Sequence, residues 1–355
     1  MTFAAEKGNP LADDLDRILR HTVGLSDRLR GSRIFITGGT GFFGCWLLES
    51  FAWANDQLDL KAEAVVLTRD PQAFQKKAPH LANHPAIQLH QGDVRNFQFP
   101  QGRFDYFIHA SAESNVQVVT EQPLLLFTTH IDGARRVFEF ATQCKAKAVL
   151  FTSSGCVYGR QPPELTHLPE TYLGSPAAIT ADAVAAANAG GIWCSELLGA
   201  LYAKQHGLPV KFARCFTLMG PYLPLSKPFA ATSFLRNALA GGPINIGGDG
   251  TAVRSYLYAA DLAIWLWMIL FNGRAGEAYN VGSEEAVTIA ELAHAVADTV
   301  APGAEIRLGS TPTPGQLAER YVPSTRKAQL ELGLQQWISL PEALQRTANW
   351  HRQFR

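Results

Sequence analysis

Short runs of β-branched and aromatic residues alternate with stretches of helical periodicity from Arg33 to about residue 213. The predicted strands are 33–37, 64–68, 87–90, 106–109, 148–152 and 210–213. The predicted helices are 10–31, 45–54, 124–144 and 193–205. Strands that alternate with helices are typical of βαβ units, which build a parallel sheet covered on both faces. The pattern therefore predicts an α/β fold with a doubly wound parallel sheet.

The pattern changes in the C-terminal part of the chain. Beyond Gly220 the alternation loosens and Pro and Gly become more frequent, which predicts a second, smaller lobe. The run 262–271 is apolar on all sides, as expected of a buried helix. The Ala-rich stretch 177–191 has no aromatic residue and one carboxylate, and its pattern predicts no element.

Composition and charge narrow the class of protein. With 355 residues, 47% of them hydrophobic and 17% charged, the chain can bury a sizeable core. Lys+Arg and Asp+Glu both count 31, which disfavours a nucleic-acid-binding surface built on bulk charge. The N-terminus lacks the pattern of a signal peptide, and 262–271 is shorter than the ~20 residues that span a bilayer. We therefore expect a cytoplasmic protein without membrane association.

The cysteines predict neither disulfides nor a metal site. None of the five forms a CxxC pair or a metal-ligand spacing, so reduced thiols are expected and no metal is predicted. The histidines at 80, 84 and 90 form a loose group without carboxylates, which favours surface positions.

Three glycines, Gly38, Gly41 and Gly44, stand between the first predicted strand and the helix that follows it. Glycine permits a tight turn and a close approach of the backbone to phosphates, and a helix N-terminus attracts negative charge. In this strand–turn–helix context the triplet predicts a dinucleotide-binding turn. An ordinary turn is the alternative.

The GxxGxxG spacing resembles the short-chain dehydrogenase/reductase superfamily, in its extended branch of NAD-dependent epimerases and dehydratases. The resemblance runs from about Arg33 to Trp350. Further segments follow in the family's order: Gly92-Asp93, 109–112, 152–159, Glu196 with Tyr202, 207–214, 248–258 with Asp261, and 279–282.

This resemblance implies a division of the chain and a cofactor site. It implies a helical extension at 1–31, a dinucleotide-binding domain at 32–217 plus about 251–282, and a substrate-binding lobe at 218–250 and 283–355. The predicted cofactor residues are Gly38, Thr40, Gly41, Phe42, Phe43, Gly44, Arg69, Lys76, Asp93, Val94, His109, Ala110 and Ser111.

The resemblance also implies the chemistry. The substrate would be a nucleotide-diphosphate sugar, and the reaction an epimerisation or another 4-keto-type redox conversion. Ser154 would hydrogen-bond the reacting hydroxyl, Arg254 would bind the diphosphate, and Thr217 stands where epimerases commonly carry a substrate-binding Asn. The family pairs the helices at 124–144 and 193–205, so a homodimer is expected.

The chain departs from the family at its catalytic Tyr-x-x-x-Lys. Counting back from Glu196 places Asn188 and Ile192 at those positions, and neither supplies a phenol or an ammonium. In the family, the tyrosinate exchanges the hydroxyl proton, and the lysine lowers its pKa. Tyr172, the nearest upstream phenol, is the candidate substitute; an ordinary loop tyrosine is the alternative.

Gly155 and Cys156 stand where 4,6-dehydratases have an Asp-Glu pair. Elimination of water needs such acid–base groups, so dehydration is disfavoured. Cys156 is either a reactive thiol or a small buried side chain.

The end of the second predicted strand bears on the cofactor. A carboxylate there would bind the ribose 2′-hydroxyl of NAD. The segment Thr68-Arg69-Asp70-Pro71, with Lys76 and Lys77 beyond it, resembles that of NADP-dependent flavonoid reductases. Arg69 and Lys76 favour NADP over NAD because cations pair with a 2′-phosphate. Asp70 is the feature in favour of NAD.

Three functional hypotheses remain open. The chain is a sugar-modifying enzyme with a substitute base, an enzyme repurposed to a reaction without tyrosinate, or a non-catalytic NAD(P)-binding protein. The retained Ser154 and Arg254 favour an enzyme.

Overall fold

The computed structural model describes residues 9–22, 24, 26–111, 120–176 and 183–353. They fall into two compact units, each described by itself. The first unit comprises Met1–Gly159, Gly174–Arg214 and Ala263–Tyr279. The second unit comprises Arg160–Leu173, Cys215–Leu262 and Asn280–Arg355.

A seven-stranded sheet organises the first unit. Its strands are β1 (Arg33–Thr37), β2 (Glu63–Thr68), β3 (Ile87–Gln91), β4 (Tyr106–His109), β5 (Ala148–Ser154), β6 (Val210–Cys215) and β11 (Ala278–Val281), in the order β11-β6-β5-β4-β1-β2-β3. β1 pairs in parallel with β2 on one side and with β4 on the other. Its residues Ile34, Phe35 and Ile36 are fully buried, as central parallel strands require. The predicted doubly wound sheet is confirmed.

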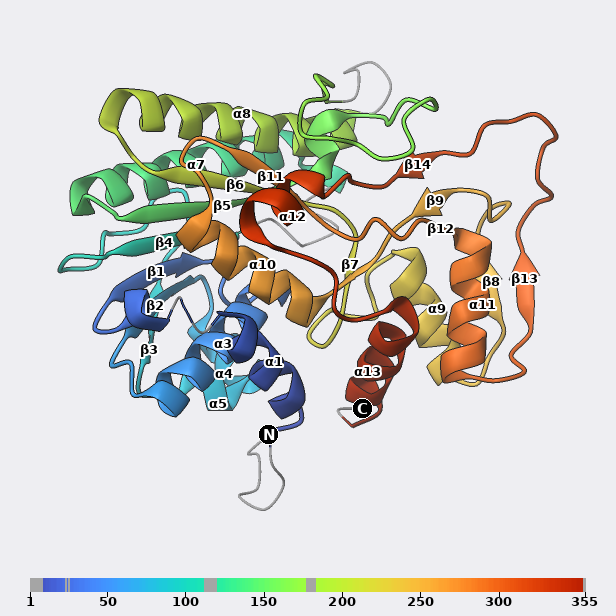
Figure 1. Ribbon diagram of the computed structural model, residues 1–355, viewed down its shortest axis with the longest axis horizontal. Helices are drawn as coiled ribbons and strands as arrows, with labels where there is room; N and C mark the ends of the chain where they lie inside the picture. The colour runs from blue at the N-terminus through green and yellow to red at the C-terminus, as the bar shows by residue number, and fades with distance from the viewer. Residues whose placement is uncertain (1–8, 23, 25, 112–119, 177–182, 354–355) are drawn as a thin grey trace. The chain divides into compact units, whose positions relative to one another are not determined.

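Helices cover both faces of this sheet (Figure 1). The chain leaves β1 through α3 (Phe42–Leu58) towards β2, and leaves β4 through α7 (Pro123–Cys144) in the opposite direction. Right-handed crossovers therefore put α3 on one face, and α7 with α8 (Ala183–His206) on the other. The β1–β4 junction, where the strand order reverses, is the point at which such sheets bind ligands.

Smaller helices complete the first unit. α1 (Ala12–Thr22) packs on α3, where Trp53 Nε1 donates to Asp16 Oδ1 at 2.9 Å. In α10 (Ala259–Asn272), Trp267 donates to Ser50 of α3 at 2.9 Å. The remaining short helices are α2 (Ser26–Leu29), α4 (Pro71–Lys77) and α5 (Pro79–Ala82).

Three helix predictions were wrong in their bounds, and the helix predicted at 45–54 is the longer α3, Phe42–Leu58. α8 begins at Ala183, ten residues before the predicted start at 193. Alanine has the highest helix propensity, but an Ala-rich segment shows no apolar periodicity to detect. The predicted helix at 10–31 is instead two helices, α1 and α2.

α8 is also long and apolar enough to cross a membrane, judged by length and composition among the described residues; buried helices of soluble proteins satisfy the same criterion.

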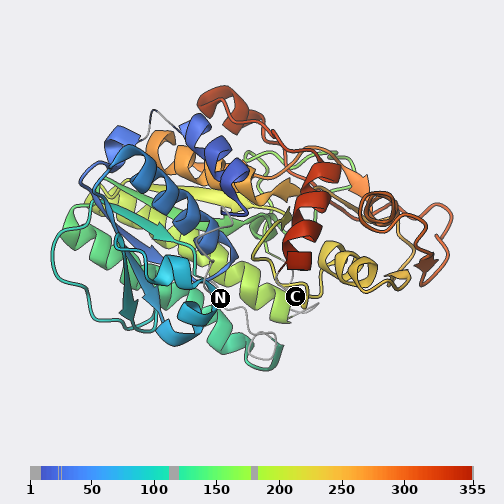
Figure 2. The same cartoon turned by 90° about the horizontal axis from the view of Figure 1, so that it is seen from below.

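The second unit combines three small sheets with four helices. β7 (Leu218–Met219) pairs with β10 (Leu257–Tyr258), and β8 (Ile244–Ile246) pairs with β13 (Ile306–Leu308). β9 (Val253–Arg254) lies between β12 (Val287–Thr288) and β14 (Arg320–Tyr321). The helices are α9 (Ala230–Leu239), α11 (Ile289–Val300), α12 (Arg326–Leu332) and α13 (Leu340–Gln353). Figure 2 shows α9, α11 and α13 gathered side by side.

The largest differences between this division and the predicted boundaries lie in two segments. Residues 160–173 join the second unit, where Gln161 Oε1 accepts from Val322 N at 2.9 Å. Residues 251–262 do so as well, since Asp261 Oδ2 accepts from the backbone N–H groups of Trp337 and Ile338, both at 3.0 Å. Such contacts join residues that are far apart in the sequence, so the local pattern of hydrophobic and polar residues does not predict them.

Candidate active site

The ends of β1 and β4 meet at the point where the strand order reverses. Thr37 Oγ1 lies 2.7 Å from His109 Nδ1 and donates to Ser111 Oγ at 3.2 Å. Burial, with His130 nearby, lowers the pKa of His109 to about 3, so its imidazole is neutral at physiological pH. The predicted residues His109 and Ser111 therefore form a polar cluster with Thr37 beneath the glycine-rich turn, in which Thr37 and His109 are buried.

The three glycines of the turn have different roles. Gly38 has φ +70°, and a Cβ there would lie 2.3 Å from Ala110 O. A Cβ on Gly44 would lie 2.2 Å from Gly39 Cα. A Cβ on Gly41 would approach only Gly38 O, at 3.2 Å, among the described atoms within 4 Å. Backbone packing thus requires glycine at 38 and 44, whereas Gly41 keeps the space outside the turn open.

The N-terminus of α3 faces this turn. Gly41 is the N-cap of the 17-residue helix and supplies no side-chain cap. The first N–H groups of a helix, here those of Phe42, Phe43 and Gly44, have no partner within the helix and carry a partial positive charge. These groups and the open space at Gly41 fit the pyrophosphate of a dinucleotide.

Charged residues lie beyond β2 and β3. Asp70 is the N-cap of α4 and accepts from Ala73 N at 2.9 Å. Asp93 pairs with Arg95 through two contacts of 2.8 Å; these hydrogen bonds, with Arg69 nearby, lower the pKa of Asp93. The carboxylate of Asp70 therefore caps α4. Asp93 is paired with Arg95, a residue that the sequence analysis did not select.

The other predicted cofactor residues flank the turn. Lys77 Nζ donates to Thr40 O at 2.8 Å, which ties α4 to the turn. Lys76 lies in the last turn of α4, and Arg69 is exposed after β2. A Cβ on Gly133 of α7 would lie 3.1 Å from Val94 Cγ1, so Val94 packs against that helix.

The carboxyl end of β5 carries Ser154, which is partly exposed. Its Oγ accepts from Cys156 N at 3.2 Å and caps the 3₁₀ helix Gly155–Tyr158. Burial raises the pKa of Cys156, so its thiol stays protonated and unreactive at neutral pH.

A buried ion pair supports this strand end. Glu196 of α8 accepts from Ser153 Oγ and pairs with Arg214 of β6 at 2.7 Å. The Arg214 guanidinium also lies over the ring of Tyr158, 4.7 Å from its centroid. Glu196 marked the family alignment in the sequence, but its role in joining β5, β6 and α8 was not predicted.

Asn188 and Ile192 both lie in α8, and they supply no acid–base group. Ile192 is buried, at 9% exposure. Asn188 is partly exposed, and its Oδ1 lies 3.1 Å from Nε2 of His130 on α7. Sequence reasoning missed His130, whose only signal is a histidine within an apolar helix pattern.

Three predicted site residues belong to the second unit. Tyr172 lies in a turn, where its N–H donates to Pro169 O at 3.0 Å. Thr217 precedes β7, and its carbonyl accepts from Leu257 N at 3.1 Å. Arg254 of β9 pairs with Glu319 at 2.6 Å.

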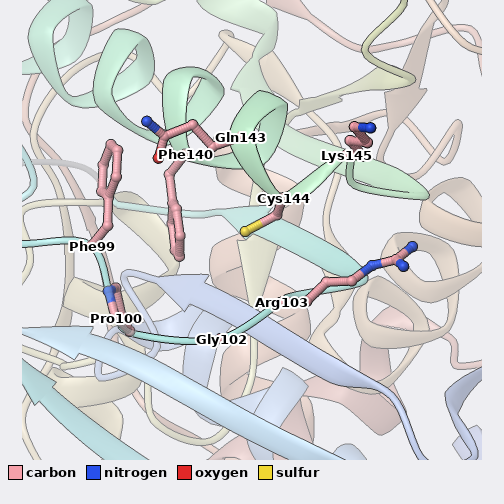
Figure 3. A pocket seen from close by; sticks show the side chains of 8 residues that line it. All are labelled: Phe99, Pro100, Gly102, Arg103, Phe140, Gln143, Cys144 and Lys145. Atoms are coloured by element: carbon pink, nitrogen blue, oxygen red, sulfur yellow. The ribbon is translucent and has the colours of Figure 1, made fainter.

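A pocket of about 460 Å³ lies away from the turn, where β4 begins and α7 ends (Figure 3). The rings of Phe99 and Phe140 stack there with centroids 4.6 Å apart, and Arg103 and Lys145 stand at the other side. Ligands of such sheets bind at the carboxyl ends of the strands, so this pocket is not the candidate active site. Among the described residues, no three His, Cys, Asp or Glu side chains gather as metal ligands.

The buried His109 predicts a loss of stability in acid. The unfolded chain binds a proton at this histidine below about pH 6.5, whereas the folded chain does so only near pH 3. The free energy of unfolding should therefore fall by up to about 1.4 kcal/mol per pH unit across this window. Denaturant titrations of His109→Gln should show a weaker pH dependence. The exposed-site control His206→Gln should keep the wild-type dependence, and equal curves for all three proteins would contradict the prediction.

The chain belongs to the NAD dependent epimerase/dehydratase family, whose model matches residues 34–282. The chain is 26% identical over 312 residues to UDP-glucuronic acid decarboxylase 6 of Arabidopsis thaliana, covering 88% of this chain and 86% of that protein. It is also 26% identical to dTDP-glucose 4,6-dehydratase of Streptomyces niveus, over 90% and 93% of the two chains.

Solved structures share the fold. The dTDP-glucose 4,6-dehydratase of Streptomyces venezuelae, solved with NAD bound, superposes with a TM-score of 0.75 at 27% identity, covering 90% of this chain and 97% of that one. UDP-glucose 4-epimerase of Thermotoga maritima gives a TM-score of 0.75 at 20% identity, over 91% and 99%. The resemblance to the extended short-chain dehydrogenase/reductase branch is thereby confirmed.

Proposed function

We propose that this chain binds NAD or NADP at the Gly38–Gly44 turn and modifies a nucleotide-diphosphate sugar by epimerisation or another 4-keto-type redox conversion. The intact turn, with the free N-terminus of α3 and the open space at Gly41, carries the proposal. A bound dinucleotide would supply the hydride acceptor. Ser154 would hold the reacting hydroxyl, and Arg254 would bind the diphosphate in place of Glu319.

The strand end at Ser154 bears on the reaction type. Gly155 offers no side chain and Cys156 only a protonated thiol, so this segment has no carboxylate for eliminating water. Epimerisation or decarboxylation therefore fits the site better than 4,6-dehydration. The similar proteins include decarboxylases and a 4,6-dehydratase at the same identity, so this choice rests on the strand end alone.

Calorimetry tests the substrate class. The purified chain, with NAD or NADP present, is titrated with UDP-glucuronic acid, dTDP-glucose and UDP-glucose, and with free glucuronic acid as the control. At least one sugar nucleotide should bind and the free sugar acid should not, because the diphosphate provides the charge that Arg254 would bind. Equal binding of Arg254→Ala and wild type would contradict the role of Arg254, and no binding of any sugar nucleotide would contradict the substrate class.

We further propose a preference for NADP over NAD. The Asp70 carboxylate caps α4, and Arg69 and Lys76 supply the cations that suit a 2′-phosphate. Arg69→Ala should weaken NADP binding by about 10–100-fold, the worth of a charge-assisted hydrogen bond, and leave NAD binding unchanged. Arg103→Ala, at the remote pocket, is the control for a lost exposed arginine. Equal losses for both dinucleotides would contradict the preference.

We also propose a homodimer built on α7 and α8. Trp193, Leu197 and Leu201 follow one another at four-residue spacing along α8 and are 42%, 47% and 51% exposed. Such a stripe of large apolar side chains marks an interaction surface. The family resemblance favours a second copy over a bilayer, in line with a cytoplasmic protein. The balanced charge gives no support for a nucleic-acid partner.

Replacing Leu197 and Leu201 with Glu should convert the dimer to a folded monomer, because two carboxylates would be buried in the interface. Light scattering measures the mass, and circular dichroism checks the fold. Wild-type protein that is monomeric at all concentrations, or that sediments with lipid vesicles, would contradict the dimer.

A further inference from the structure

His130 is a buried titratable side chain in the first half of α7, only 8% exposed. Its Nε2 lies 3.1 Å from Oδ1 of Asn188. An amide oxygen only accepts hydrogen bonds, so Nε2 carries the proton and donates it. When the imidazole is neutral, its lone pair is then on Nδ1. Asn188 thereby selects the tautomer of His130 that has a basic Nδ1.

The pair lies at the carboxyl edge of the sheet. His109, the last residue of β4, is close enough to His130 for the two to interact electrostatically. α7 and α8 each run back towards the amino edge after β4 and β5, so their N-terminal halves, which hold His130 and Asn188, lie near the strand ends. Ser154 ends β5 at the same edge.

α8 is also shaped to receive the ring. A Cβ on Gly191 would lie 3.1 Å from both Cβ and Cδ2 of His130. A side chain at 191 would therefore press on the imidazole, whereas glycine lets the ring fit against α8. Asn188 and Gly191, one helical turn apart, together fix the position and the tautomer of the imidazole.

We propose that His130 is the acid–base residue of this chain and that Asn188 positions it. The inference rests on the proposed function. When the sugar carbon is oxidised, the hydroxyl proton would pass to Nδ1 of His130, and a bound oxidised dinucleotide would supply the hydride acceptor. Asn188 Oδ1 stabilises the resulting imidazolium, which returns the proton when the keto group is reduced. A general base whose ring is oriented by a neighbouring side chain, as Asn188 would orient His130, is a recurring arrangement for proton transfer.

The local surroundings suit this role. His109 faces His130 from β4, and burial keeps it uncharged near neutral pH, so it does not compete for the proton. The Thr37 hydroxyl holds His109 Nδ1 at 2.7 Å. Asn188 and Gly191 of α8, which both lie against His130, are themselves uncharged.

Nitrogen-15 NMR of the free protein tests the positioning without any substrate. His130 should appear as the Nε2–H tautomer in the wild type and as a mixture in Asn188→Ala. Asn188→Asp should retain the tautomer and raise the pKa of His130, because a carboxylate favours imidazolium. An Nδ1–H tautomer, or a spectrum that Asn188→Ala leaves unchanged, would overturn the positioning.

Turnover of the sugar nucleotides tests the acid–base role. His130→Ala should lower kcat by about 10²–10⁴-fold with unchanged dinucleotide affinity. Asn188→Asp should stay active, with its pH–rate profile moved to higher pH. His80→Ala is the control, since it removes another histidine hydrogen bond, that to Glu49 at 2.7 Å. If the wild type turns over a sugar nucleotide and His130→Ala does so equally fast, this inference alone is overturned. If the wild type binds a sugar nucleotide but does not convert it, the catalytic function and this inference are both overturned.

Discussion

A Gly41→Val variant should fold and yet lose measurable dinucleotide binding. A Cβ at this position approaches only Gly38 O, at 3.2 Å, so the turn needs a small shift to accept it. The remainder of the valine side chain would project into the space where the pyrophosphate would approach the N-terminus of α3. Calorimetry with NAD and NADP measures the loss, and thermal unfolding checks the fold. A folded variant with wild-type affinity would contradict the cofactor site.

Gly44→Ala is the matched control for this result. Its Cβ would lie 2.2 Å from Gly39 Cα and 2.3 Å from Gly38 O, both backbone atoms that the turn cannot easily move. We therefore expect Gly44→Ala to lower the melting temperature, whereas Gly41→Val should do so only slightly. Similar stability losses in both variants would show that Gly41, too, serves backbone packing.

The second large effect is expected at the buried ion pair. Glu196→Ala should lower the free energy of unfolding by about 3–5 kcal/mol, because the Arg214 guanidinium would remain buried without its partner. Ser153 would also lose its acceptor. Chemical denaturation of Glu196→Ala, of Arg214→Ala and of the double variant measures the coupling free energy between the two side chains. Additive losses would show that the pair does not act as a unit.

The fold could be predicted from the sequence wherever local pattern and burial agree. β1, the glycine turn and β4 were predicted at their observed positions, because fully buried strands are continuous apolar runs. The start of α8 could not be predicted, because Ala183–Gly191 shows no apolar periodicity and its helicity rests on propensity and packing.

The site was less predictable, because its contacts join distant segments. The glycine triplet has a local signature, and its position at the reversal of strand order followed from the fold. The hydrogen bond between His130 and Asn188 joins residues 58 apart on different helices, and no spacing rule identifies such a pair. Likewise, Arg254 could be selected by resemblance, but its pairing with Glu319, 65 residues away, could not.

Counting back from Glu196 predicts Asn188 and Ile192 at the positions of the family's tyrosine and lysine, which makes turnover the deciding observation. A chain with Asn188 and Ile192 at those positions either uses another proton acceptor or only binds its ligands. The retained turn, Ser154 and the buried His130 favour the first of these. We therefore propose that this chain catalyses its reaction without the family's Tyr-x-x-x-Lys.

The most direct test is mass spectrometry of sugar nucleotides after incubation with the wild-type chain. The protein is mixed with NAD or NADP and, in turn, with UDP-glucuronic acid, dTDP-glucose and UDP-glucose, with Gly41→Val as the inactive control. We predict that the wild type converts at least one sugar nucleotide. Gly41→Val should convert none of them. Recovery of every sugar nucleotide unchanged from wild-type protein that binds its dinucleotide would contradict the claim.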